Sequence, residues 1–391
     1  MPLYFDYAAT APLHPKALAA MMPFIEGDYA NPSSIYGPAR IVRKAIDEAR
    51  LTVAKALNSK PDEIFFTGSG TEADNWAIKG VLEAQSGKGR HIITTSAEHH
   101  AVLYTCRHLE KLGYDITYLP VDSEGFVSPE EVKAAIRQDT VLVSVILANN
   151  EVGTIQPMAA IGEITRKAGV ILHTDAVQAV GHAPVDVEAL QVDILSLSAH
   201  KFSGPKGVGA QYVRKGTRIV PLLHGGAQER GRRAGTENIS GIVGLAAALA
   251  ASAEEMAKEA PRISRLRDKL IDEILTAIPH TRLNGPRCNR LPGNVNISFG
   301  FIEGESLLLH LDMLGCQAST GSACSSGALE PSHVLIAMGI SHEQANGAIR
   351  FSLGRETTAE DIDKLMPMLT SSVARLRELS PLYDDYQKKA R

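Results

Sequence analysis

The stretch Thr140-Val-Leu-Val-Ser-Val-Ile-Leu-Ala148 is almost entirely apolar between its two ends. Such a run is typical of a central strand that is buried on both faces of a sheet. Further β-type runs lie on both sides of it and alternate with segments that could form helices. These candidate strands are Ile64–Thr67, His91–Thr95, Ile116–Leu119, Val170–Thr174 and Asp193–Ser198. The alternation predicts an α/β fold, with a mostly parallel sheet flanked by helices.

Helical periodicity supports the same architecture. Apolar residues recur every three or four positions over Arg40–Leu57, and helices are also predicted at Ala101–Leu112, Pro129–Arg137 and Met158–Lys167. Beyond the alanine-rich stretch Ile239–Ala251 the pattern changes. There we expect helices at Arg262–Ile278, Glu305–Leu314 and Glu360–Leu376, and a strand at Val295–Phe299. We therefore predict an N-terminal arm (1–15) that joins a smaller α+β C-terminal domain (255–391), and a large domain over 16–254.

Composition restricts the class of protein. The 391 residues include 40 Lys and Arg against 44 Asp and Glu, a formal net charge of −4, which gives no general attraction for nucleic acid or for an anionic membrane. The four cysteines are too few for a disulfide framework of this length. The acidic N-terminal segment does not resemble a signal peptide, and Ile239–Ala251 is too short to span a bilayer of ~30 Å. We expect a cytoplasmic protein.

Polar residues follow the predicted strands at the points where the strands end. The groups are Gly68-Ser-Gly-Thr-Glu72, Glu98-His-His100, Asn149-Asn-Glu151, Asp175 with Gln178, and Ser198-Ala-His-Lys201. Ligands of open parallel sheets bind outside the carboxyl ends of the strands. We therefore expect these five groups to meet at one ligand-binding edge.

The glycine loop at residues 68–72 has three interpretations. Its spacing matches a dinucleotide-binding fingerprint, with Glu98 as the acid that would bind a ribose. It could also be a tight turn without a ligand. A third interpretation is a phosphate site made of backbone N–H groups at a helix N-terminus, with help from the Thr71 hydroxyl. The loop alone does not decide among them.

Lys201 favours the third interpretation. A lysine at the ligand edge of a parallel sheet can be partly desolvated, which makes its amine nucleophilic. Together with a phosphate site and a nearby acid it suits pyridoxal 5'-phosphate, with Lys201 as the Schiff-base lysine and Asp175 as partner of the ring nitrogen. Asp175 could instead cap a following helix. His99 could stack on the cofactor ring, or be an ordinary loop histidine.

One cysteine lies in a run of small residues, Ser319-Thr-Gly-Ser-Ala-Cys-Ser-Ser-Gly327. No neighbouring apolar residue would bury Cys324, so we expect an exposed, reactive thiol on a mobile loop. Burial is the commoner fate of a free cysteine, and Cys316, next to Met313 and Leu314, fits that fate. The thirteen histidines show no zinc-binding spacing.

At this point the chain resembles a known family, the NifS/IscS-type cysteine desulfurases, which are class-V aminotransferase-like enzymes of pyridoxal phosphate fold type I. Gln228–Asn238 and Arg290-Leu-Pro292 are similar to the NifS branch in particular. The motifs that carry the wider resemblance are Asp6–Thr10, Asn31–Ser34, Gly70–Asn75, Glu98–Val102, Asn149–Glu151, His173–Gln178, Ser198–Lys201, Arg230–Thr236, Gly321–Cys324, Leu329–His333 and Arg350–Gly354.

The resemblance implies a role for each matching residue. Lys201 would bind the cofactor and move the Cα proton of the substrate, and His99 would stack on the ring. Asp175 would pair with the ring nitrogen, Gln178 with the phenolic oxygen and Asn150 with the ring edge. Arg350, assisted by Asn31, would bind the substrate carboxylate. The phosphate would be held by Gly70, Thr71, Ser198 and His200, and by Thr236 of a second subunit of a homodimer.

The implied reaction converts L-cysteine to L-alanine. The Cys324 thiolate would attack the substrate sulfur and retain it as a persulfide, for delivery to an iron–sulfur scaffold or another acceptor protein, including nitrogenase cluster assembly. Cys324 would also be a transient cluster ligand through that persulfide. Tyr7 stands where many relatives carry Asn, which leaves fine substrate positioning open. Alternatives are an aminotransferase or selenocysteine lyase of the same fold, and a dinucleotide-binding or sulfur-carrier protein without pyridoxal chemistry.

Overall fold

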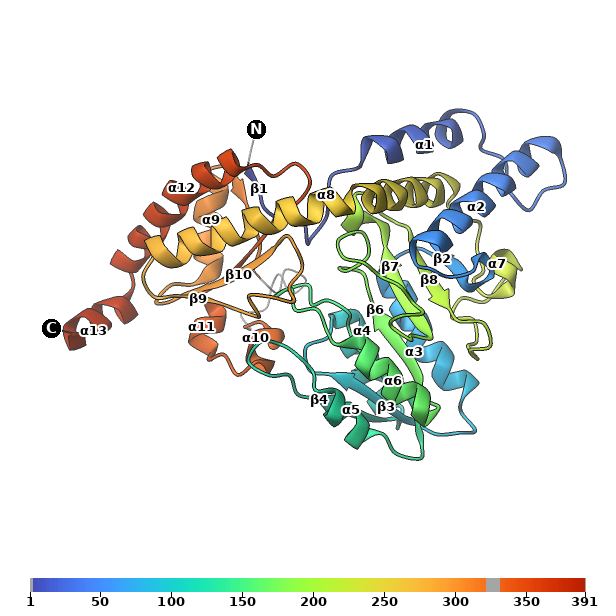
Figure 1. Cartoon of the computed structure of the whole chain (residues 1–391), viewed down its shortest axis with the longest axis horizontal. Helices are drawn as coiled ribbons and strands as arrows, with labels where there is room; N and C mark the ends of the chain where they lie inside the picture. Colours follow the sequence, from blue (N-terminus) through green and yellow to red (C-terminus); the bar gives the residue numbers. More distant parts are fainter. Residues whose placement is uncertain (1–2, 321–330, 391) are drawn as a thin grey trace.

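The structure is a computed structural model that describes residues 3–320 and 331–390. It has a large lobe and a small lobe, and both contact one long helix, α8 (Figure 1). The large lobe contains, in chain order, α1(Pro15–Glu26), α2(Gly37–Ala56), η1(Pro61–Glu63), β2(Ile64–Thr67), α3(Gly70–Ala84), β3(His91–Thr95), α4(His100–Lys111), β4(Asp115–Leu119), α5(Pro129–Ala135), β5(Thr140–Ser144), α6(Met158–Ala168), β6(Ile171–Asp175), β7(Ile194–Ser198), η2(Ala199–Phe202), β8(Gly209–Val213) and α7(Gln228–Gly231).

In the described part of the chain, the large lobe is built on a seven-stranded sheet of order β2-β8-β7-β6-β5-β3-β4. Strands β7, β6, β5, β3 and β4 pair in parallel, whereas β8 runs antiparallel to both of its neighbours. The predicted α/β class and mostly parallel sheet are therefore confirmed. Because the parallel strands end at the same edge, the polar groups that follow them are brought together.

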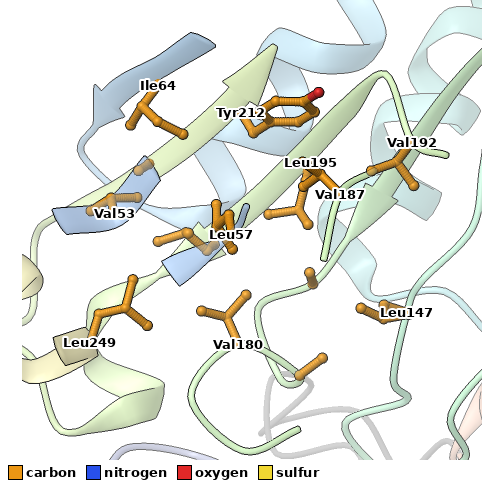
Figure 2. Close-up of a cluster of buried hydrophobic side chains, with 14 of the residues drawn as sticks. Val53, Leu57, Ile64, Leu147, Val180, Val187, Val192, Leu195, Tyr212 and Leu249 are labelled. Atoms are coloured by element: carbon orange, nitrogen blue, oxygen red, sulfur yellow. The ribbon is translucent and has the colours of Figure 1, made fainter. Parts of the chain in front are cut away.

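Helices bury both faces of this sheet. On one face α2, α6 and the first half of α8 pack on the strands. Figure 2 shows Val53 of α2 and Leu57, the residue after this helix, in one apolar cluster with Leu195 and Tyr212 of the sheet. On the other face α3 and α4 bury Trp76, among others. A sheet covered on both faces needs apolar strands, which explains the composition of β5.

The remaining elements are β1(Leu3–Tyr4), α8(Ile239–Ala277), β9(Thr281–Leu283), β10(Asn294–Phe299), α9(Gly304–Met313), β11(Cys316–Gln317), α10(His333–Ala337), α11(His342–Asn346), β12(Ala348–Ser352), α12(Ala359–Glu378) and α13(Pro381–Ala390). In the small lobe the described strands form an antiparallel sheet of order β12-β10-β9, and β1 pairs in parallel with β11. Leu3 and Phe5 pack in the same apolar cluster as α9 and α12. The division of the chain at residue 255 falls inside α8 and stays a proposal.

Three of the differences from the sequence-based expectations concern the large lobe and α8. Strand β8 was not predicted, because Gly209, Ala210 and Gln211 have low strand preference. Strand β5 ends at Ser144 rather than Ala148, although the amides of Val145 and Leu147 still donate to carbonyls of β6.

The third difference is α8. Its alanine-rich and charged parts form one helix of 39 residues that continues through Pro261. Within residues 3–320 and 331–390 it is the one helix long and apolar enough to cross a membrane, so the expectation that this segment is too short was wrong. Its residues Ile242, Leu245 and Leu249 nevertheless lie in the apolar core, as in the core helix of a soluble protein.

Candidate active site

A cavity of about 380 Å³ lies at the carboxyl edge of the parallel strands. The small lobe contributes Arg350 and His333 to its lining, and the N-terminal arm contributes Ala8 and Ala9. The predicted site residues that line it are Gly70, Thr71, His99, Asn150, Asp175, Gln178, Ser198, His200, Lys201 and Arg350. The structure thus brings together residues from all five strand-end groups.

The N-terminus of α3 opens into this cavity. Ser69 caps the helix by accepting a hydrogen bond from the Glu72 amide, and Gly70 and Thr71 are the first helical residues. A Cβ atom on Gly70 would lie 2.6 Å from a methyl group of Val177, so only glycine permits this close approach. Free N–H groups at a helix N-terminus form an anion site, which suits the phosphate interpretation.

The dinucleotide interpretation fails at Glu98. Its side chain is fully buried and accepts hydrogen bonds from the Thr95 hydroxyl and the Ile146 amide, 2.9 Å each. Burial raises the pKa of this carboxyl well above its usual range. Glu98 therefore supports the β3–α4 connection from within the core and is not presented to a ribose.

Lys201 is positioned by η2, the turn that follows β7. Its Nζ donates hydrogen bonds to the carbonyl oxygens of Ala8 at 2.6 Å and Ala9 at 2.8 Å. Gln178 Nε2 also donates to the Ala8 carbonyl, at 2.9 Å. The N-terminal arm therefore belongs to the site through its backbone, which side-chain patterns could not indicate.

Asp175 lines the cavity and is the last residue of β6. Burial is the main cause that raises the pKa of this carboxyl, and the neighbouring Asp74 carboxyl adds to it. No helix begins directly after Asp175: the next residues form turns, and Oδ1 accepts a hydrogen bond from the Val177 amide at 2.9 Å. Asp175 is thus no helix cap. A buried acid of this kind is suited to a cationic partner such as a protonated ring nitrogen.

His99 both lines the cavity and caps α4, because its Nδ1 accepts a hydrogen bond from the Ala101 amide at 3.2 Å. Burial lowers the pKa of the imidazole to about 4, with further lowering by Lys201, His100 and His333. The ring that lines the cavity is therefore neutral at physiological pH.

Arg350 reaches the cavity from β12 and is almost fully buried. It donates to the Asn150 carbonyl at 3.0 Å and to Asp6 at 2.9 Å, while its Nε has no hydrogen-bond partner. A buried, unsatisfied guanidinium N–H is costly, so the site favours a further acceptor such as a carboxylate.

Three predicted or noted residues lie outside the cavity lining. Asn31 is exposed and accepts from the Ser33 amide, so the structure does not bring it to Arg350 as expected. Thr236 lines a separate cavity of about 130 Å³. Tyr7 is buried against Gly354 and lines a different cavity. Cys324 lies outside the described residues.

We expect Arg350→Gln to raise the KM for the amino-acid substrate about 10- to 150-fold, because this is the usual cost of losing a hydrogen bond to a charged group. The effect on kcat should be smaller, because the residue binds the carboxylate in the ground state as well as in the transition state. Steady-state kinetics would measure the split, with Arg350→Lys as the control that keeps the charge. An unchanged KM in Arg350→Gln would contradict the carboxylate assignment.

The polar groups that the cavity presents fit pyridoxal phosphate. Asn150 Oδ1 and Asp74 Oδ1 are buried without a hydrogen-bond partner, next to the lysine, the acid and the helix N-terminus described above. Buried polar atoms are normally hydrogen-bonded, so these two unpaired oxygens in the cavity lining are open to a bound group.

Comparison with known proteins agrees with a pyridoxal phosphate site. The family model described as aminotransferase class-V matches residues 3–365. A cysteine desulfurase IscS of Dictyoglomus turgidum is 54% identical over 385 residues, 98% of each chain. The solved structure of a NifS-like protein superposes with a TM-score of 0.91 at 41% identity, covering 96% of this chain and 100% of its own. The structure of SspA in complex with cysteine gives 0.79 at 37% identity, covering 90% and 98%.

Fold and cavity together define a pyridoxal-phosphate-dependent enzyme of fold type I. Its relatives at more than half identity share one activity by name. The chain belongs to the class-V aminotransferase family, in its NifS/IscS-type cysteine desulfurase group.

Proposed function

We propose that this protein converts L-cysteine to L-alanine and passes the sulfur, through a persulfide on Cys324, to iron–sulfur cluster assembly. The observation that carries the proposal is that Lys201, Asp175 and Arg350 line one cavity in a chain 54% identical to a cysteine desulfurase. An amine, a buried acid and a carboxylate-binding guanidinium are what the chemistry of a bound amino acid requires.

The cofactor, when bound, supplies an electron sink that stabilises negative charge at the Cα of an attached amino acid. Lys201 would hold it through Nζ, and Asp175 would keep its ring nitrogen protonated. The N-terminus of α3, with Thr71, Ser198 and His200, would bind its phosphate. His99 would lie against its ring as a neutral stacking partner.

The other side chains handle the substrate. Arg350 would bind the carboxylate of L-cysteine, which aligns the Cα–H bond for the Lys201 amine. That amine removes the Cα proton and returns a proton to the alanine product. The Cys324 thiolate attacks the substrate sulfur: a sulfur–sulfur bond forms, the carbon–sulfur bond breaks, and its electron pair stays with the carbon skeleton.

Two partners belong to the proposal. An acceptor or scaffold protein must take the sulfur, and Cys324 would then be a transient cluster ligand through its persulfide. A homodimer is supported by Thr236, which lies outside the cavity of its own chain, and by large apolar side chains exposed around α1 and α2. These side chains are Leu18, Ile25, Tyr29, Ile35, Tyr36 and Ile41. Nitrogenase supply and cytoplasmic location stay predictions.

The test is the purified holoenzyme with L-cysteine and a reductant. We expect visible absorption from the cofactor and alanine formed in equal amount to sulfide. Alanine that forms only when a keto acid is consumed or produced would indicate an aminotransferase instead. A strong preference for selenocysteine would indicate a lyase, and a colourless protein that does not take up pyridoxal phosphate would overturn the proposal.

A further inference from the structure

A second carboxyl group besides Asp175 lines the candidate cofactor site. Asp74, on α3, is 1% exposed, lines the cavity, and has an Oδ1 without a hydrogen-bond partner. A carboxylate oxygen of Asp74, one of Asp175 and a ring nitrogen of His99 all lie within 4.8 Å of one another. The residue was not predicted from the sequence, and the proposed mechanism does not use it.

The surroundings of Asp74 offer it little positive charge. His173 Nε2 lies 3.5 Å from Asp74 Oδ1, and burial lowers the pKa of that imidazole to about 4, so the ring is neutral. The two nitrogens of His173 lie 2.8 Å from the Ser144 hydroxyl and 3.0 Å from the Ser196 hydroxyl. Besides His173, the titratable groups that face Asp74 and Asp175 are Glu98, His99 and Lys201.

Two carboxyl groups this close in a buried site do not both ionise readily. Burial raises the pKa of Asp74, and burial together with Asp74 raises that of Asp175. The cluster suits protons rather than a metal ion. Because His99 Nδ1 accepts the Ala101 N–H, the other nitrogen of the neutral ring carries the proton and has no lone pair for a cation.

We propose that Asp74 and Asp175 form a carboxyl pair that holds one proton in the empty site and transfers it to the cofactor's ring nitrogen on binding. The O–H bond of the pair breaks and an N–H bond forms on the ring, so this step needs no proton from solvent. Asp74 acts through Asp175 and is a positioning residue. The inference rests on the proposed function, in which Asp175 is the ring-nitrogen partner.

The test is calorimetric titration of the apoprotein with pyridoxal phosphate in two buffers of different ionisation enthalpy, which measures proton uptake. In Asp74→Asn the remaining acid is more fully ionised before binding. We expect this variant to take up more protons than the wild type, by up to one per cofactor. Its affinity should accordingly fall more steeply with rising pH, by up to tenfold per pH unit. Asp312→Asn, an exposed acid of α9, is the matched control.

Thermal unfolding of the apoprotein against pH gives a second readout. A carboxyl whose pKa is raised by folding stabilises the fold below its unfolded pKa, near 4, and this stability is lost as pH rises through the folded pKa, about 7 for Asp74. The wild type should lose stability across that range, and Asp74→Asn should lose less. Asp74→Ser provides a second variant should the first fail to fold.

The outcomes separate the inference from the proposed function. Equal proton uptake and equal pH slopes in wild type and Asp74→Asn would overturn the carboxyl pair. An apoprotein that does not bind pyridoxal phosphate would overturn the proposed function. A third outcome concerns Asp175→Asn. If this variant leaves both the absorption spectrum and the affinity of the cofactor unchanged, Asp175 is not the ring-nitrogen partner, and the inference is overturned together with that assignment.

Discussion

Replacing Lys201 with alanine is expected to lower kcat for alanine formation from L-cysteine by about 10²–10⁴-fold, the usual loss when a positioned proton-transfer group is removed. The side chain is held in the cavity by the carbonyls of Ala8 and Ala9. No other lysine lines this cavity among the described residues. A second amine is therefore not in place to move the Cα proton. Alanine formation under steady-state conditions measures the loss.

A second measurement separates a missing amine from a damaged site. Treatment of the holoenzyme with borohydride should fix the cofactor covalently on the wild type but not on Lys201→Ala, as seen by mass. Lys206→Ala is the matched control, because Lys206 is exposed and only five residues away. Covalent labelling that persists in Lys201→Ala, or activity lost equally in Lys206→Ala, would contradict the assignment.

The positions of Lys201 and Asp175 could be predicted because topology decides them. Asp175 ends β6 and Lys201 lies in the turn directly after β7, and parallel strands deliver their carboxyl ends to one edge of the sheet. The same reasoning placed the Gly70 loop and His99 at that edge. This prediction of the site's location needed no detail of side-chain packing. It is therefore unaffected by β8, a strand of the same sheet that was not predicted.

Other parts of the site depend on contacts between segments far apart in sequence. Asp74 is within a helix, and only the packing of α3 against β6 and β7 turns it toward Asp175. The carbonyls of Ala8 and Ala9 have no sequence signal. Arg350 lies on an unpredicted strand, β12, and was placed by family resemblance alone. Glu98 shows the opposite error. It follows a strand and could have faced a ligand, but its side chain is buried and forms hydrogen bonds within the core.

Replacing Cys324 with alanine is expected to lower persulfide formation by at least about 10³-fold, the order of loss when a covalent nucleophile is removed. The described residues on either side of its segment form hydrogen bonds with residues that line the cavity. Ser319 and Arg350 exchange backbone hydrogen bonds, and the Ser332 hydroxyl donates to Glu151. Cys324 is five residues after Ser319, and covalent geometry limits that distance to about 18 Å.

The other cysteines are poor substitutes. Burial raises the pKa of Cys106 and of Cys316 to about 12, so neither is a thiolate near neutral pH. Cys288 is exposed but does not line the cavity, which makes Cys288→Ala the matched control. Mass measurement after L-cysteine should show one added sulfur atom in wild type and Cys288→Ala but not in Cys324→Ala, while all three keep the cofactor's absorption. Because Lys201 and Arg350 stay intact, Cys324→Ala should still bind L-cysteine, and the cofactor's absorption spectrum should change on binding. If Cys324→Ala formed a persulfide at the wild-type rate, another group would be the one that accepts the sulfur.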